Sequence, residues 1–398
     1  MAEERTQKKK KTEELVLKRR RRNVLLLMAE IALCLTLGIG AVICQRTVNA
    51  LNNEDLDPDV YKESIYSPTS MSISEVEVTN AAGEVIGKEQ IEIPIYSTTK
   101  KYRNILIVGV DARSQFNYED GGVNTDVMII ASLNNETGEV KLVSILRDTA
   151  MRIEGTNRFD KANSQFYSGI SDTVSMMNRN LGLDIEEYVV INWYGVAVCV
   201  NQIGGIEMTI KDKQQLGWFN GYLTAVNNAT GIWAPQLTAP GTYLMSGTQV
   251  VAYCRIRYGG LNDTGRTSNQ REAINKILEK AKGIMKSGDI NTILNVAETG
   301  LGNVKTNLRL PEIVYLATNI ENYSITGSRQ FPVNYTSSES TGNFIAKYGK
   351  NLNWAIVAND FAGEVKALHE FLFDDPNYNP SDFVKQVSYQ MYLDRVGQ

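Results

Sequence analysis

The sequence predicts an α/β fold in which a mixed central sheet carries helices on both faces. Continuous apolar runs between turn residues are typical of strands covered on both faces. Such runs occupy residues 104–110, 127–133, 140–146, 188–192 and 206–210. Apolar residues at helical spacing lie between or after them at 172–181, 194–203 and 270–285. Strands that alternate with helices indicate a sheet packed between helical layers.

The first part of the chain predicts a membrane anchor. Residues 1–22 are rich in lysine and arginine, and residues 23–44 form a mostly apolar run long enough to cross a bilayer. Basic flanks stay in the cytoplasm, so we expect a single span with the rest of the chain extracellular. Cleavage after Ala50 would instead release a secreted protein.

The remainder divides by composition into three parts. We expect residues 45–100 to form an extracellular spacer with a β-hairpin around residues 80–83. Residues 101–375 are expected to form the main domain, and residues 376–398 a C-terminal tail. Residues 1–46 hold 11 Lys and Arg against 5 Asp and Glu, so the whole-chain charge of −4 leaves −10 for the rest. An acidic domain of this kind has no general affinity for nucleic acid.

Cysteine and histidine usage excludes several mechanisms. No clustered cysteine pattern indicates zinc, and the single histidine, His369, falls in a helical pattern where we expect a surface or packing role. The sequence therefore lacks the histidines that a Ser-His-Asp or Cys-His mechanism would need near its nucleophile. Cys199 and Cys254 lie in the extracellular part, either bridged or as two separate buried thiols.

Arginines supply the most informative pattern. Residues 250–258 read as a strand, on which Arg255 and Arg257 would point to the same side. Arg266 and Gln270 follow at the start of a helical pattern, and Arg147 ends another apolar run. Burying several guanidinium groups costs free energy unless anions neutralise them. The planar guanidinium group also matches the geometry of phosphate oxygens, to which it can donate two hydrogen bonds. We therefore expect a polyphosphate pocket rather than scattered structural ion pairs.

Two aspartates lie at strand ends. Asp111 directly follows the first strand, and Asp126 precedes the second. Ligands of open α/β sheets gather at strand ends, and two carboxylates beside phosphate oxygens would hold Mg²⁺. One of them would orient or deprotonate an attacking hydroxyl.

Seven ordered motifs in the main domain resemble those of the LytR-CpsA-Psr family, from about residue 104 to 374. They are NILIVGVDAR at 104–113, TD at 125–126, VSILRDT at 143–149, KAN at 161–163, QIGGI at 202–206, AYCRIR at 252–257 and GRTSNQR at 265–271. The resemblance implies an α-β-α sandwich and a phosphotransferase of Gram-positive cell envelopes. Such enzymes move a glycopolymer from a polyprenyl-pyrophosphate carrier to peptidoglycan, usually to the 6-hydroxyl of muramic acid.

The resemblance also assigns roles. It implies that the pyrophosphate is bound by Arg113, Arg147, Arg255, Arg257, Arg266 and Gln270. Asp111 and Asp126 would bind Mg²⁺, and Asp111, Arg147, Arg255 and Arg257 would be the catalytic residues. A hydrophobic cavity would take the prenyl tail.

One departure from the family pattern is Asn124, where the family commonly has arginine. This loss would weaken a phosphate contact or alter acceptor preference. A pyrophosphatase that uses water at the same site, and a non-catalytic protein that binds polyprenyl phosphates, are the alternatives.

Overall fold

The computed structural model describes residues 67–79, 85–97, 101–110, 122–257, 262–287, 303–308, 316, 319–337 and 342–396. Within these ranges no helix is long and apolar enough to cross a membrane, and the predicted span at 23–44 lies outside them. β1 (Ser67–Thr79) and β2 (Val85–Ser97) pair antiparallel, and the predicted turn at 80–83 between them lies outside the described residues.

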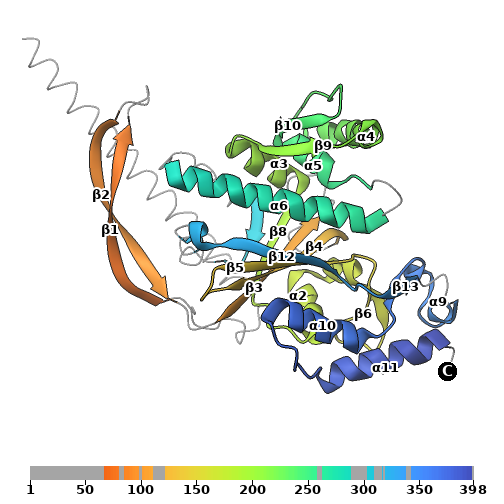
Figure 1. Cartoon of the computed structure of the whole chain (residues 1–398). Coiled ribbons are helices and arrows are strands. Elements are labelled where there is room, and N and C mark those ends of the chain that lie inside the picture. The colour runs from red at the N-terminus through yellow and green to blue at the C-terminus, as the bar shows by residue number, and fades with distance from the viewer. Residues whose placement is uncertain are drawn as a thin grey trace, which may run out of the picture. The chain divides into compact units, whose positions relative to one another are not determined.

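A six-stranded mixed sheet forms the centre of the main domain (Figure 1). Its strands lie in the order β11-β8-β3-β4-β5-β12. β4 runs antiparallel to β3 and β5, whereas β8 and β12 run parallel to β3 and β5 respectively. The predicted mixed sheet is confirmed, with strands β3 (Tyr102–Val110), β4 (Thr125–Asn134), β5 (Glu139–Ile145), β8 (Glu187–Asn192), β11 (Val304–Thr306) and β12 (Ser324–Phe331).

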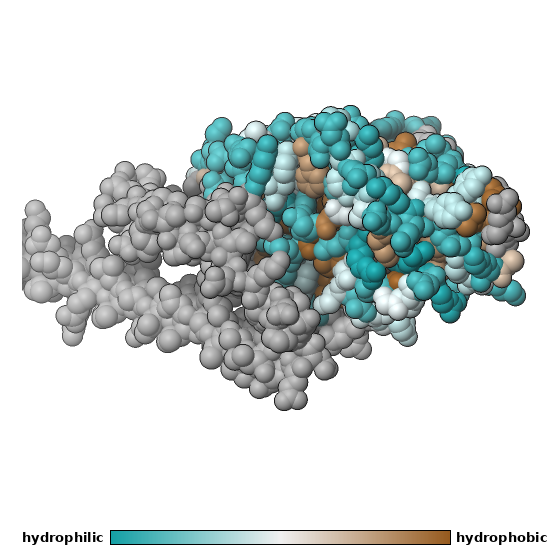
Figure 2. Space-filling model, turned by 90° about the horizontal axis from the view of Figure 1, so that it is seen from below, coloured by the Kyte–Doolittle hydropathy of each residue, from teal (hydrophilic) through white to brown (hydrophobic). Residues whose placement is uncertain are grey.

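One face of the sheet packs on α2 (Ile170–Leu181), α10 (Phe361–Phe373) and α11 (Asp382–Val396). Leu106 and Ile130 of the sheet share a buried cluster with Met391 of α11. Residues 376–398, expected to be a tail, thus contain a helix that completes the core. The outer side of this layer is mostly hydrophilic (Figure 2).

The other face packs on α6 (Asn262–Ser287), which lies between two apolar clusters. Ile274 packs against the sheet cluster, while Ala273 and Ile277 belong to a second core. That core is formed by α3 (Trp193–Gln202), α4 (Lys213–Thr230), α5 (Gly247–Cys254), β9 (Ile206–Ile210) and β10 (Gly241–Met245). Helix α6 therefore connects the sheet to this second group of elements.

Short elements complete the described domain. The β6–β7 hairpin and the 3₁₀ helix η2 follow β5 directly and border the site described below. Their bounds, with those of the remaining elements, are β6 (Ala150–Arg152), β7 (Phe159–Lys161), η2 (Ala162–Ser168), η3 (Ile320–Asn322), β13 (Tyr335–Ser337), α9 (Gly342–Tyr348), η5 (Lys350–Leu352) and β14 (Ile356–Ala358).

The predicted strand at 250–258 is wrong. Residues 247–254 form helix α5, and Arg255 occupies its C-terminal cap in a near-helical conformation. A short apolar run that is buried on all sides has the same sequence pattern in a strand and in a core helix. The capping box of Ser246 and Gln249, present in the structure, is the sequence signal that marks a helix start.

Helix α5 crosses α3 at a point where only glycine fits, which gives a first prediction. A Cβ at Gly247 would lie 1.9 Å from the carbonyl oxygen of Ala197. Gly247→Ala should therefore lower the free energy of unfolding by about 1–3 kcal/mol or more, measured in urea. Gly217→Ala is the matched control, because α4 leaves open space there, and it should be neutral or stabilise by up to about 1 kcal/mol. Equal effects of the two substitutions would contradict this packing.

The single histidine gives a second prediction. His369 is buried, its Nε2 lies 2.8 Å from the carbonyl oxygen of Leu181, and its ring stacks on Tyr378. Burial lowers the pKa of His369. As the pH falls, the histidine is therefore protonated in the unfolded chain, near pH 6.5, before it is protonated in the folded chain. Stability should be full above that pH and fall as the pH drops through the lowered folded pKa, by at most about 1.4 kcal/mol per unit.

Urea unfolding between pH 5.5 and 7.5 measures this slope. His369→Gln retains a hydrogen-bond donor but does not titrate, so its free energy of unfolding should vary less with pH in this window. Identical slopes for the two proteins would show that His369 is not the titrating group.

Candidate phosphate site at the sheet edge

The topology brings several strand ends to one edge of the sheet. β4 is antiparallel to both neighbours, so its first residues lie beside the last residues of β3 and β5. Asp126 at the start of β4 therefore lies next to Arg147, just after β5. Asp111 follows Val110 of β3 directly in sequence, but Asp111 and Arg113 lie outside the described residues.

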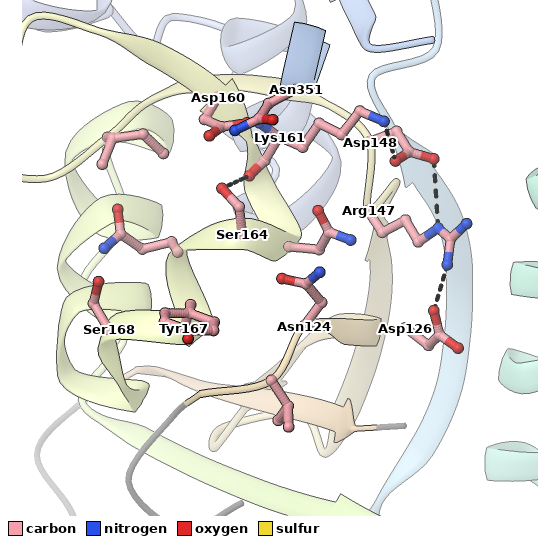
Figure 3. Close-up of a pocket in the computed structure, with 14 residues that line it drawn as sticks. Asn124, Asp126, Arg147, Asp148, Asp160, Lys161, Ser164, Tyr167, Ser168 and Asn351 are labelled. Atoms are coloured by element: carbon pink, nitrogen blue, oxygen red, sulfur yellow. Dashed lines mark hydrogen bonds and ion pairs between the residues drawn. The ribbon is translucent and has the colours of Figure 1, made fainter. Parts of the chain in front are cut away.

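Alternating charges run across this edge. Arg147 donates from Nη1 to Oδ1 of Asp126, and its Nε lies 3.4 Å from Oδ2 of Asp148 (Figure 3). Lys161 Nζ lies 3.2 Å from Oδ1 of Asp148. At the other end, Nη1 of the buried Arg266 on α6 lies 3.9 Å from Oδ1 of Asp126. These five groups form a charged chain, so named below, that connects α6 to the end of β7.

A pocket of about 960 Å³ opens beside the charged chain. Its charged members are Asp126, Arg147, Asp148, Asp160 and Lys161. Arg255, Arg257, Arg266 and Gln270 do not line it. The rest of the lining comprises Val123, Asn124, Ile153, Asn163, Ser164, Gln165, Tyr167, Ser168 and Asn351.

Arg255 and Arg257 lie beyond the end of α5, not on a strand. The guanidinium carbon of Arg255 lies 3.7 Å from the ring centroid of Trp193 and 5.3 Å from that of Tyr222. Cation–π stacking on these two rings therefore helps to hold the Arg255 guanidinium in place. Arg257 is exposed two residues further on.

Gln270 and Arg271 attach α6 to its neighbours. Gln270 is buried, and its Nε2 donates to the carbonyl oxygen of Cys254 at 3.4 Å, at the end of α5. Arg271 donates from Nη1 to Oγ of Ser144 on β5 at 2.7 Å, and burial lowers its pKa. These contacts place α6 against both α5 and the sheet edge.

The thiols are not activated. Cys199 and Cys254 are free, and burial raises the pKa of Cys199. Burial and the nearby carboxylate of Glu272 raise the pKa of Cys254 to about 12. A thiolate nucleophile at either position would be disfavoured at neutral pH.

The described residues offer one carboxylate of the expected metal pair. Asp126 presents a carboxylate at the pocket, and Mg²⁺ is commonly held by one or two carboxylates together with substrate phosphates. Asp126 thus fits as a ligand, and the other expected ligand, Asp111, lies outside the described ranges. Among the described residues, no group of three or more His, Cys, Asp or Glu could hold a metal ion.

Sequence reasoning gave no role to Asp148, Lys161 or Asn163, although all three stand in the quoted motifs. The β6–β7 hairpin folds back and brings them together: Asn163 N donates to the carbonyl oxygen of Arg147 at 3.0 Å. Their positions in the VSILRDT and KAN motifs were the available signal. Asn124, the departure from the family arginine, also lines the pocket.

The LytR_cpsA_psr family model matches residues 67–355. The chain belongs to this family. The match covers more than half of the sequence and includes every described member of the charged chain.

Relatives of this family member carry related names. The chain is 28% identical over 216 residues to the polyisoprenyl-teichoic acid–peptidoglycan teichoic acid transferase TagU of Enterococcus faecalis, covering 54% of this chain and 64% of that protein. It is 25% identical over 319 residues to TagV of Bacillus subtilis, covering 76% and 70% respectively. A solved structure described as TagT bound to LI-WTA shares the fold, with a TM-score of 0.52, 20% identity, and 70% of this chain and 92% of that one covered.

The charged chain predicts that Arg147 and Arg266 both contribute to phosphate binding. Inorganic pyrophosphate should raise the melting temperature of the wild-type protein, because it binds the folded state. Arg147→Ala should weaken the binding of pyrophosphate because it removes a charge-assisted hydrogen bond. Arg266→Lys should weaken it because lysine keeps the charge but lacks the planar guanidinium that can donate two hydrogen bonds. A loss of about 1.5–3 kcal/mol corresponds to about 10- to 150-fold in Kd.

Arg179→Ala is the control for loss of one positive charge. Arg179 pairs with Glu154 on the surface of α2 and does not line the pocket. Isothermal titration calorimetry should show wild-type affinity for this variant. Unchanged affinity in the Arg147 and Arg266 variants would contradict the assignment.

Proposed function

We propose that this protein is a phosphotransferase that moves a glycopolymer from a polyprenyl-pyrophosphate carrier to peptidoglycan at the cell envelope. Membership of the family and the names of its relatives support the reaction class. The observation that carries the proposal is the charged chain at the sheet edge. It links Arg147, which lines a pocket large enough for more than a phosphate group, through Asp126 to Arg266 on α6.

The proposed reaction is an in-line displacement at phosphorus. The acceptor hydroxyl oxygen attacks the phosphorus next to the glycopolymer, and the bond from that phosphorus to the bridging oxygen breaks. The electron pair leaves with polyprenyl phosphate, and the hydroxyl proton passes to a base. Arg147 and Arg266 neutralise the oxygens that gain charge, which is the main contribution a protein makes to phosphoryl transfer.

Asp126 has two functions in this proposal. Its carboxylate binds Arg147 and lies near Arg266, so it keeps two guanidinium groups together before the substrate arrives. Asp126 and Asp111 would also hold Mg²⁺, which supplies further positive charge to the phosphate oxygens when bound. Asp111 is the base that we propose for the acceptor hydroxyl.

The proposed compartment rests on the sequence. We propose that residues 23–44 anchor the chain in the cell membrane with residues 1–22 in the cytoplasm and the main domain outside. Both substrates, a polyprenyl-linked glycopolymer and peptidoglycan, are reached from that side. The names of the relatives, which include teichoic acid and peptidoglycan, support these partners.

A transfer assay with full-length protein, a polyprenyl-pyrophosphate-linked glycopolymer and peptidoglycan tests the proposal. Mass spectrometry should find polyprenyl phosphate and a polymer joined to the acceptor by a phosphodiester. Asp126→Asn and chelation with EDTA should each reduce transfer by roughly 100-fold or more, as expected when charge stabilisation at the transferred phosphate is lost.

Asp172→Asn serves as the control, because Asp172 lies in the first turn of α2 and outside the pocket lining. It should retain wild-type transfer. Undiminished transfer in EDTA would contradict the metal. Free polymer that has incorporated oxygen from labelled water, with no acceptor product, would instead identify a pyrophosphatase, and binding of the lipid without turnover a non-catalytic protein.

A further inference from the structure

The pocket has two chemically different sides. Arg147 and Asp148 lie on one side with Asp126, while Tyr167 and Ser168 lie on the opposite side (Figure 3). Beyond the charged residues, the lining consists mainly of neutral hydrogen-bonding groups. We call this set the neutral arm: Asn124, Asn163, Ser164, Gln165, Tyr167, Ser168 and Asn351.

Hydrogen-bonding capacity in the neutral arm is left open toward the cavity. Asn163 is only 9% exposed, yet its side-chain amide makes no hydrogen bond to any described residue. Within the same ranges, the side chains of Asn124 and Asn351 and the hydroxyl of Tyr167 also make none. These side chains stand in the wall of the pocket, so their donors and acceptors are placed to bind a ligand with complementary polar groups.

The charges in the pocket disfavour a second anion. Arg147 and Lys161 already contact Asp126 and Asp148, and Asp160 adds a third carboxylate to the lining. A neutral ligand rich in hydroxyl and amide groups matches asparagine and serine side chains, which both donate and accept. Tyr167 is 65% exposed and offers a flat aromatic surface beside them. Together these groups suit an N-acetylated sugar ring.

We propose that the neutral arm binds a sugar ring of the acceptor glycan, an inference that rests on the proposed function. The pocket volume of about 960 Å³ leaves room for a sugar beside a phosphate. Arg266 reaches Asp126 from α6, on one side of the charged chain, and the neutral arm extends from η2 on the other. In-line displacement puts the incoming hydroxyl opposite the leaving group. If the lipid phosphate lies toward α6, an acceptor sugar bound by the neutral arm places its hydroxyl opposite this leaving group.

The test uses surface positions, so that folding is preserved. Tyr167→Ala and Asn351→Ala alter exposed residues of the neutral arm. Tyr389→Ala is the matched control, because Tyr389 on α11 is also 65% exposed and does not line the pocket. Each neutral-arm variant should raise the KM for the peptidoglycan acceptor by about 3- to 10-fold, with kcat and the KM for the lipid-linked donor unchanged.

A second measurement is independent of turnover. A phosphate-free disaccharide fragment of peptidoglycan should bind the full-length wild-type protein in calorimetry, and about 3- to 10-fold more weakly to each neutral-arm variant. The control should match wild type in both measurements.

The outcomes separate this inference from the proposed function. A raised KM for the donor alone would overturn it, because the arm would then hold a sugar of the donor polymer. Fragment binding and acceptor KM equal to wild type in both variants would also overturn it. If no transfer occurs with any donor but the variants lose fragment binding, the sugar subsite is supported and the proposed function is contradicted.

Discussion

The ion pair between Arg147 and Asp126 is the interaction on which the site depends. It joins the end of β5 to the start of β4, and Asp126 in turn faces Arg266 on α6. Two guanidinium groups this close would repel each other without a carboxylate between them. Asp126 therefore stabilises a positive site before any phosphate is present.

Helix α6 is the other constraint, because it belongs to two cores at once. Ile274 packs on the sheet, whereas Ala273 and Ile277 pack on the group formed by α3, α4 and α5. Arg266 and Arg271 of α6 contact the sheet edge, and Gln270 contacts the end of α5. The position of the arginines is thus fixed by packing on both sides. Preorganisation of this kind is what electrostatic stabilisation of a transition state requires.

Much of the fold followed from sequence patterns, but part of the site did not. The apolar runs gave strands β3, β4 and β5 because strands covered on both faces have no polar alternation. The same reasoning failed at 250–258, since a fully buried helix has the same pattern. Arg147 and Asp126 were each predicted as site residues because both flank apolar runs, but their ion pair was not predicted. Asp148, Lys161 and Asn163 were not, because only the β6–β7 hairpin brings them to the pocket.

The structure of the protein in complex with a prenyl pyrophosphate would test the central claim most directly. We predict that phosphate oxygens lie within hydrogen-bond distance of Arg147 and Arg266, and that Arg147 exchanges at least one contact with Asp126 or Asp148 for phosphate. A pyrophosphate bound elsewhere, with the Arg147–Asp126 pair intact and no phosphate contact from Arg266, would contradict it.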